Sequence, residues 1–188
     1  MAEMSADFLQ GFVLGLAMQP LYVVAQGDEP VVETKRYLYK AGDECTALTG
    51  GWNGRAVAGS GTNTGSFTKS DDRMVLVSSG SNAYCFTIAE TTKAINFAGY
   101  DKLKAEVVAP STNSSIYCDF GISTNPVNDM YSNTTKVVQS GKSNDMVTLE
   151  IDITGYQGSY YVDFLADVGN TITLFNVRLE KINRRNLS

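Results

Sequence analysis

Alternation of apolar and polar residues, rather than a helical period, dominates residues 36–181 of this 188-residue chain. In the clearest run, Val147, Leu149, Ile151 and Ile153 alternate with Thr148, Glu150 and Asp152. A period of two places one set on the buried face of a strand and the other toward solvent. Clusters of Gly, Asn, Ser and Asp separate these runs. The pattern predicts about eight short strands in an all-β jelly-roll sandwich over residues 36–182.

Other runs assign residues to strand faces in the same way. The predicted same-face sets are Tyr84, Phe86 and Ile88; Leu103, Ala105 and Val107; Ile116, Cys118, Phe120 and Ile122; and Tyr160, Val162, Phe164 and Ala166, which alternate with Tyr161, Asp163 and Leu165. The last run changes phase between Leu174 and Phe175, which predicts a β-bulge or a twist at a sheet edge.

Residues 1–20 follow a different, almost wholly apolar pattern with helical spacing. Ser5 suits a helix N-cap and Pro20 bars continuation, so residues 5–18 are predicted to form a helix. A short helix of this kind is marginal in water and needs a partner surface. The residues predicted to form an anchor or oligomerisation surface are Phe8, Leu9, Gly11, Phe12, Val13, Gly15 and Leu16. A helix folded back onto its own domain is the alternative.

The segments that flank the predicted sandwich are short. Residues 21–35 are predicted to be a linker or an edge strand, and residues 183–188 a tail. The apolar run near the N-terminus is shorter than the roughly 20 residues that span a bilayer, so no transmembrane span is predicted. No Lys or Arg precedes Lys35, so the basic region of a signal peptide is missing. We therefore expect the protein to be made and kept in a cytoplasm.

Composition narrows the chemistry. The chain has no histidine, which excludes Ser-His and Cys-His catalysis and His-based zinc sites. Its formal net charge of −5 argues against a nucleic-acid partner. Cys45, Cys85 and Cys118 are too widely spaced for a zinc or redox motif. We expect reduced thiols that act as small apolar residues. The alternative is one disulfide and one free thiol, with the pairing unassigned.

Four segments carry a family resemblance. Residues 37–52 (YLYKAGDECTALTGGW) look like the opening strand and turn of small jelly-roll domains in phages of Gram-positive gut bacteria, and residues 172–180 are similar to the closing strand of carbohydrate-binding-module-like sandwiches. Residues 95–104 and 149–162 are similar to segments of carbohydrate-binding-module-like sandwiches. Over residues 36–181 the chain thus resembles small jelly-roll structural proteins of phages that infect Gram-positive gut bacteria. Residues 8–17 also look like the short apolar leader of such phage proteins.

A glycan site is predicted around the single tryptophan. Trp52 follows Gly50 and Gly51, a turn that would present its indole at a rim beside Asn53 and Arg55. Aromatic rings stack on the apolar faces of sugars while polar neighbours bind the hydroxyl groups. The tyrosines predicted to extend this patch are Tyr117, Tyr131, Tyr156 and Tyr161. The alternative is that Trp52 fills the core and that each tyrosine packs across strands.

No catalytic residue, required cofactor or metal site is predicted. Six acidic residues at turns and strand ends would offer oxygen ligands to a structural calcium ion, although their spacing is not that of an EF-hand. They are Asp43, Glu44, Asp71, Asp72, Asp163 and Asp167. Glu150 and Asp152 share one strand face, but alternating charge on a solvated sheet explains them better than a pair of hydrolytic carboxylates. The inventory indicates a protein that is not an enzyme.

Together these observations predict a phage virion accessory protein, such as a head decoration, a head fibre or a tail-associated adhesin. Its N-terminus would dock on capsid or tail proteins and its jelly roll would project outward and contact host-surface carbohydrate. Assembly in the host cytoplasm fits the missing signal peptide. We expect a symmetric homo-oligomer, a trimer or a dimer, formed through the leader and the adjoining strand edge. The alternative function is a stand-alone carbohydrate-binding module.

Overall fold

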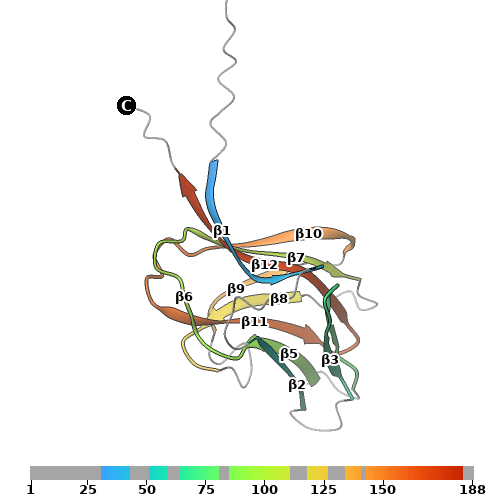
Figure 1. The fold of residues 1–188 in the computed structure, drawn as a ribbon. Coiled ribbons are helices and arrows are strands. Elements are labelled where there is room, and N and C mark those ends of the chain that lie inside the picture. The colour runs from blue at the N-terminus through green and yellow to red at the C-terminus, as the bar shows by residue number, and fades with distance from the viewer. Residues whose placement is uncertain are drawn as a thin grey trace, which may run out of the picture. The chain divides into compact units, whose positions relative to one another are not determined.

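Two β-sheets packed face to face contain the strands of the computed structural model (Figure 1). The structure describes residues 31–42, 51–58, 64–80, 85–110, 118–126, 134–140 and 143–183. These ranges contain twelve strands, and the pairs with a resolved register are antiparallel. The predicted all-β sandwich is therefore confirmed.

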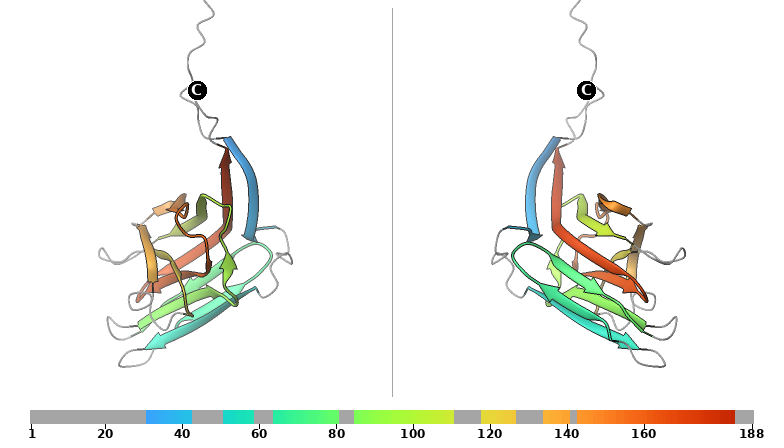
Figure 2. Two further views of the ribbon diagram at one scale, coloured as in Figure 1. Left: turned by 90° about the vertical axis from the view of Figure 1, so that its left-hand side faces the viewer. Right: turned by 90° about the vertical axis from the view of Figure 1, so that its right-hand side faces the viewer.

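Sheet 1 has six strands in the order β10-β7-β12-β4-β3, with β1 paired to β12 beside this path. Their bounds are β1 Val31–Lys40, β3 Ser66–Lys69, β4 Met74–Val77, β7 Lys102–Ala109, β10 Ser143–Asp152 and β12 Thr171–Asn183. Figure 2 shows β1 and β12 running side by side. The chain thus enters and leaves the sandwich on neighbouring strands of the same sheet.

Sheet 2 also has six strands, in the order β2-β5-β11-β8-β9, with β6 paired to β11 beside this path. Their bounds are β2 Trp52–Ala58, β5 Cys85–Thr91, β6 Ile95–Asn96, β8 Cys118–Ser123, β9 Thr134–Ser140 and β11 Ser159–Asp167. The central strand β11 pairs with β5 on one side and with β8 on the other.

The inward faces of the two sheets enclose the main core. Leu149, Ile151 and Ile153 are buried, and Val147 packs against them, as their alternation predicts. The predicted inward residues Leu103, Ala105 and Val107 of β7 lie in the same core, as do Phe120 and Ile122 of β8. Phe120 stacks on Phe164 of β11 with ring centroids 4.7 Å apart. Complete burial of one such side chain contributes about 1.5–3 kcal/mol, so these positions hold the sheets together.

The phase change in the last strand is a β-bulge. The pairing of β12 with β7 shifts register between Leu174 and Asn176, which confirms the expected irregularity. The extra residue allows both Leu174 and Val177 to point into the core although three positions separate them.

The strand count exceeds the expected eight because short strands lack a usable pattern. Strand β3 has no buried residue and β6 contains only two residues, so neither shows alternation. Strand β1 begins at Val31, within the segment for which a linker or an edge strand was predicted.

Several expectations concern residues outside the described ranges. The predicted helix at residues 5–18, with its seven anchor residues, and Cys45 belong to this group, as do the side chains of Cys85 and Cys118. Within the described ranges there is no helix with the length and hydropathy needed to cross a membrane.

Candidate functional site

Trp52 is a core residue. It is only 6% exposed, and its ring centroid lies 5.8 Å from that of Phe164. The indole Nε1 donates a hydrogen bond of 3.1 Å to the Leu38 carbonyl, which ties the edge of sheet 2 to strand β1 of sheet 1. A buried ring with its N–H satisfied offers no face for a sugar. Of the two roles considered from the sequence, Trp52 takes the packing role, and the predicted exposed platform is not at this position.

Asn53, Arg55 and Tyr161 share the outward face of sheet 2. Each alternates with an inward residue, Trp52 on β2 or Val162 on β11, and therefore points away from sheet 1. Asn53 is exposed, whereas Arg55 and Tyr161 are half-buried. The structure thus brings three of the predicted glycan-binding residues onto one surface.

Gly54 lies between Asn53 and Arg55 and allows β2 to pass close to sheet 1. A Cβ atom at this position would overlap the Phe67 side chain of β3. Only glycine leaves room for that ring, so the local sequence Asn-Gly-Arg holds the two outward side chains at a corner where the sheets meet.

Four carboxyl groups also point outward from sheet 2, and we call this surface the acidic face. The four residues are Glu90 on β5, Asp119 on β8, and Asp163 and Asp167 on β11. Glu90, Asp119 and Asp163 are buried, at 6%, 2% and 0% exposure. Carboxylates on the solvent side of a sandwich are ordinarily exposed, so burial here needs local compensation.

A row of polar contacts crosses the acidic face from edge to centre. The Arg55 guanidinium pairs with Glu90 at 2.7 Å between Nη1 and Oε1. Glu90 is the cross-strand partner of Asp163. The Ser123 hydroxyl lies 2.9 Å from Asp163 Oδ2 and 2.8 Å from the Asn125 carbonyl oxygen. Asp163 Oδ1 is buried and accepts no hydrogen bond.

The environment raises the pKa of two of these groups. Burial, with the neighbouring negative charge of Glu90, raises the pKa of Asp163 to about 8, although the hydrogen bond from Ser123 opposes the shift. Burial and the charge of Asp119 raise the pKa of Asp167 to about 6. Both shifts favour the protonated form of the carboxyl group over the ionised form.

A small apolar cluster lies beside the acidic residues. Ile88 and Leu165 are both fully buried, with Val57 and Phe86 packed against them, in a cluster separate from the main core. Phe86 and Ile88 share a face as predicted, but that face points outward from sheet 2. Strand β5 instead contributes Ala89 to the main core.

Tyr156, another of the predicted tyrosines, does not join this surface. Tyr156 is half-buried and packs against the main core, with its ring edge-on to Tyr160 at 5.5 Å. This is the packing role considered as the alternative. Tyr117 and Tyr131 lie outside the described residues.

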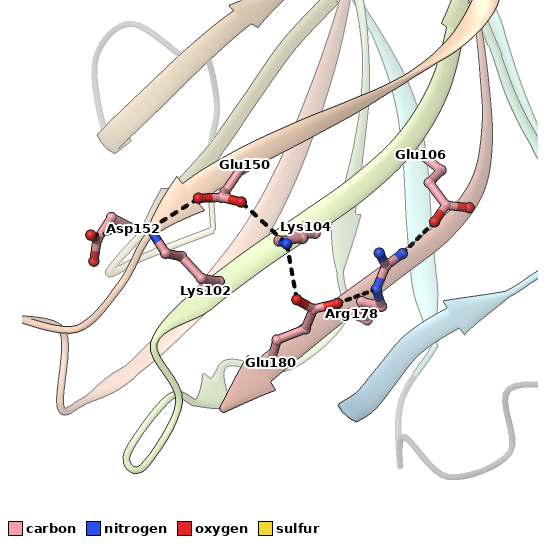
Figure 3. A network of polar contacts seen from close by, with 7 residues as sticks. All are labelled: Lys102, Lys104, Glu106, Glu150, Asp152, Arg178 and Glu180. Carbon is pink, nitrogen blue, oxygen red and sulfur yellow. Dashed lines mark hydrogen bonds and ion pairs between the residues drawn. The ribbon is translucent and has the colours of Figure 1, made fainter. Parts of the chain in front are cut away.

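The outward face of sheet 1 carries a chain of ion pairs, which we call the ion-pair face (Figure 3). Lys102 contacts both Glu150 and Asp152, at 2.9 Å and 3.3 Å. Lys104 bridges Glu150 to Glu180, at 3.3 Å and 3.0 Å. The seven residues of this ion-pair network, drawn in Figure 3, are Lys102, Lys104, Glu106, Glu150, Asp152, Arg178 and Glu180.

Arg178 completes this chain at the bulged strand. Its guanidinium contacts Glu180 at 2.7 Å and Glu106 at 2.5 Å, and Asn176 donates a further hydrogen bond to Glu106. Burial raises the pKa of Glu180, but hydrogen bonds from Arg178 and Lys104 outweigh it, so the net pKa is lowered. The hydrogen bond from the Thr154 backbone N–H lowers the pKa of Asp152 to about 2.

Glu150 and Asp152 thus belong to a sheet surface on which acidic residues pair with Lys and Arg, in agreement with the preferred interpretation of their alternation as charge on a sheet surface. Each carboxylate contacts lysine. Their lowered pKa values keep both ionised at neutral pH, whereas a general acid in glycoside hydrolysis needs a raised value.

The candidate calcium ligands are dispersed. Asp71 and Asp72 are exposed near the β3–β4 turn, whereas Asp163 and Asp167 lie on the acidic face, and Asp43 and Glu44 fall outside the described residues. Among the residues that the structure describes, no group of three or more His, Cys, Asp or Glu side chains has the arrangement needed to hold a metal ion.

The sequence did not reveal the Glu90–Asp163 pair. Each residue has a local signal, because Glu90 follows Ile88-Ala89 and Asp163 interrupts the apolar run of β11. An acidic residue inside an apolar strand indicates a special environment. Nothing in the sequence indicates that these two strands are neighbours.

Comparison with known proteins supports the architecture. No protein-family model matches the chain, and no curated protein matches its sequence. A solved family 29 carbohydrate-binding module is similar with a TM-score of 0.51 at 14% identity, covering 79% of this chain and 88% of that chain. A family 11 module of a cellulosomal cellulase of Clostridium thermocellum gives 0.51 at 11% identity, covering 81% and 98%. The protein therefore has a jelly-roll sandwich fold like that of carbohydrate-binding modules.

Proposed function

We propose that the protein is a non-enzymatic carbohydrate-binding protein that contacts a glycan through Asn53 and Arg55, with Tyr161 on the same face. The observation that carries this proposal is the Arg55 guanidinium, which Glu90 holds at 2.7 Å while 37% of the side chain stays exposed. It stands on a fold similar to that of carbohydrate-binding modules.

The chemistry of these side chains suits sugar hydroxyl groups. A guanidinium fixed through one N–H keeps other donors in a planar fork, which binds paired oxygens with little further loss of entropy. Asn53 supplies both a donor and an acceptor about 7 Å along the same strand. The Tyr161 ring adds an apolar surface with a polar tip. A row of directional donors beside an aromatic ring is the arrangement that orients a sugar.

Calorimetric titration with soluble mannohexaose and cellohexaose tests the proposal. We expect binding by the full chain and a loss of about tenfold in affinity for Arg55→Lys, because lysine keeps the charge but loses the planar fork. Arg73→Lys is the matched control, since Arg73 is exposed at the β3–β4 turn. Equal affinities for both variants would remove Arg55 from the site, and no binding of any hexasaccharide would count against a glycan ligand.

More specifically, we propose that the protein is an accessory component of a phage virion and that residues 1–20 dock on capsid or tail proteins. The support for this proposal is the resemblance of the chain to small phage jelly-roll proteins and the placement of β1. This strand follows the leader and belongs to sheet 1, whereas Asn53 and Arg55 lie on sheet 2. A stand-alone carbohydrate-binding module is the alternative.

Light scattering on size-exclusion peaks separates these two functions. We expect the full chain to form a dimer or trimer and a chain that starts at Val31 to remain a monomer with unchanged glycan affinity. Monomers in both cases would contradict an assembly role for the leader and favour the stand-alone module.

A further inference from the structure

Glu90 and Asp163 form a buried carboxyl pair in which one oxygen of Asp163, Oδ1, accepts no hydrogen bond. They face each other in register across β5 and β11, at 6% and 0% exposure. Two ionised carboxylates this close in a buried site repel each other strongly. Arg55 contacts the pair at Glu90, through a hydrogen bond of 2.7 Å from Nη1 to Oε1.

The carboxyl group of Asp163 has few hydrogen-bond donors near it. In the described structure, the Ser123 hydroxyl is the donor within reach of its carboxyl group, at 2.9 Å. That hydroxyl has one hydrogen, and the Asn125 carbonyl oxygen competes for it at 2.8 Å. Asp163 Oδ1 receives none. An ionised carboxylate with at most one shared donor would be severely undersolvated. A protonated carboxyl group is satisfied, because it donates as well as accepts.

We infer that the folded protein holds one proton between Glu90 and Asp163, and that this proton keeps Glu90 in the position from which it orients Arg55. Asp163 and Glu90 are thus positioning residues for the guanidinium. The consequence for glycan affinity rests on the proposed function, whereas the shared proton does not.

Charged and polar groups reach the pair from each neighbouring strand. Strand β2 supplies Arg55, and β8 supplies Ser123 and Asp119. On β11 itself, Asp167 lies on the same face and adds negative charge. One guanidinium therefore faces several carboxyl groups, and this charge balance favours retention of the proton. The raised pKa of Asp163, about 8, is consistent with the same arrangement.

Loss of the proton changes what Arg55 contacts. Above about pH 8 the pair would carry two negative charges on adjacent strands. Repulsion would then separate the carboxylates, and the Arg55 guanidinium would be drawn toward the pair and away from solvent. Glycan affinity through Arg55 should therefore fall at alkaline pH.

Infrared difference spectroscopy of the full chain tests the shared proton without any ligand. We expect a protonated-carboxyl C=O band at pH 7 that disappears with a midpoint of about 8. Asp163→Asn should remove this band, because the amide is neutral and reproduces the donor and the acceptor of the protonated acid. Asp152→Asn, on the ion-pair face, is the matched control and should keep it. Absence of this band from the spectrum of the wild-type protein at pH 7 would overturn the inference. That measurement does not depend on whether either variant folds.

Nitrogen-15 NMR of the Arg55 guanidinium and titration with mannohexaose test the positioning role. We expect the Arg55 Nε–H signal of the wild type to shift with the same midpoint, and that of Asp163→Asn to stay constant. Mannohexaose affinity should fall about tenfold between pH 7 and pH 10 in the wild type, as for one lost charge-assisted hydrogen bond, and stay flat in Asp163→Asn. A pH-independent Arg55 signal would overturn the positioning role. The band and the NMR shift without any binding would retain the inference and reject the proposed function.

Discussion

The two outward faces of the sandwich use the same residue types with opposite results. On the ion-pair face, Glu180 is 1% exposed and its pKa is lowered. On the acidic face, Asp163 is 0% exposed and its pKa is raised to about 8. The difference lies in the partners. Glu180 receives Arg178 and Lys104, whereas the carboxyl group of Asp163 receives one hydroxyl and faces another acid.

Burial alone therefore does not determine the charge of a carboxyl group. Desolvation raises the pKa at both sites, and the number of cationic donors decides which form survives. The ion-pair face should stabilise the folded protein at pH values at which its carboxyl groups are ionised. The acidic face should stabilise the folded protein more at low pH than at high pH. Substitutions on the two faces should therefore change stability in different ways, with the largest effect at Asp163.

The largest effect should come from Asp163→Asn. Because the folded-state pKa of about 8 exceeds the ordinary value of 3.8, the folded state holds a proton that the unfolded state releases. The free energy of unfolding should thus fall as pH rises from about 4 to about 8. Asn mimics the protonated acid, so this decline should vanish and stability at pH 7 should rise by up to about 4 kcal/mol. Urea unfolding across this range measures it, and a wild-type profile without the decline would contradict the assignment.

Arg178→Met tests the opposite face. The guanidinium contacts Glu106 and Glu180, and Glu180 would be left buried with Lys104 as its remaining cation. Removing one partner of a buried pair costs about 3 kcal/mol. We expect a loss of that size in urea unfolding at pH 7, with recovery as pH falls and the carboxyl groups take up protons. Arg73→Met, at an exposed turn, serves as the control, and an equal loss there would argue against the network.

Asp167→Asn sharpens the comparison within the acidic face. The pKa of Asp167 is raised to about 6, chiefly by burial, so its unfavourable contribution grows as pH rises from about 4 to about 6. Water screens this partly exposed group, and we expect a gain of only about 1 kcal/mol at pH 7. Thermal unfolding at pH 4 and pH 7 measures it. A gain larger than that of Asp163→Asn would reverse our ranking of the two sites.

Lys102→Met should have the smallest effect. Its partners Glu150 and Asp152 have side chains 42% and 51% exposed, so water already screens these pairs. Exposed pairs contribute about 0.5 kcal/mol and weaken with salt. Unfolding in low and high salt should show a small difference that salt removes. A loss comparable to that of Arg178→Met would mean that the whole chain of ion pairs acts as one unit.

Much of the fold was predictable because alternation is a local property. The inward positions of Leu149, Ile151 and Ile153 and the bulge after Leu174 were read from the pattern and confirmed. The charged outward side of β10 was likewise predictable, since Glu150 and Asp152 alternate with apolar residues. Local alternation assigns a residue to a face but does not identify what covers that face.

The candidate site was predictable only in part for this reason. Asn53 and Arg55 lie together on the outward face of sheet 2, but Trp52, expected beside them, points inward because it alternates with them on β2. Glu90 and Ser123 were not predicted as part of the site, and Asp163 was considered only as a calcium ligand, although each lies in a recognisable strand. Their meeting requires β5, β11 and β8 to be neighbours, which follows from the order of strands in the sheet.

The secondary structure class, the inward residues of the long strands and the absence of histidine chemistry could all be inferred from the amino-acid sequence alone. These follow from period, composition and turn residues, which act over a few positions. The tertiary structure, by contrast, places the carboxyl groups of the ion-pair face beside Lys and Arg, and places Asp163 on the acidic face beside another carboxyl group. Electrostatic environment depends on which strands lie side by side and how deeply they are buried, and residues far apart in the chain set both.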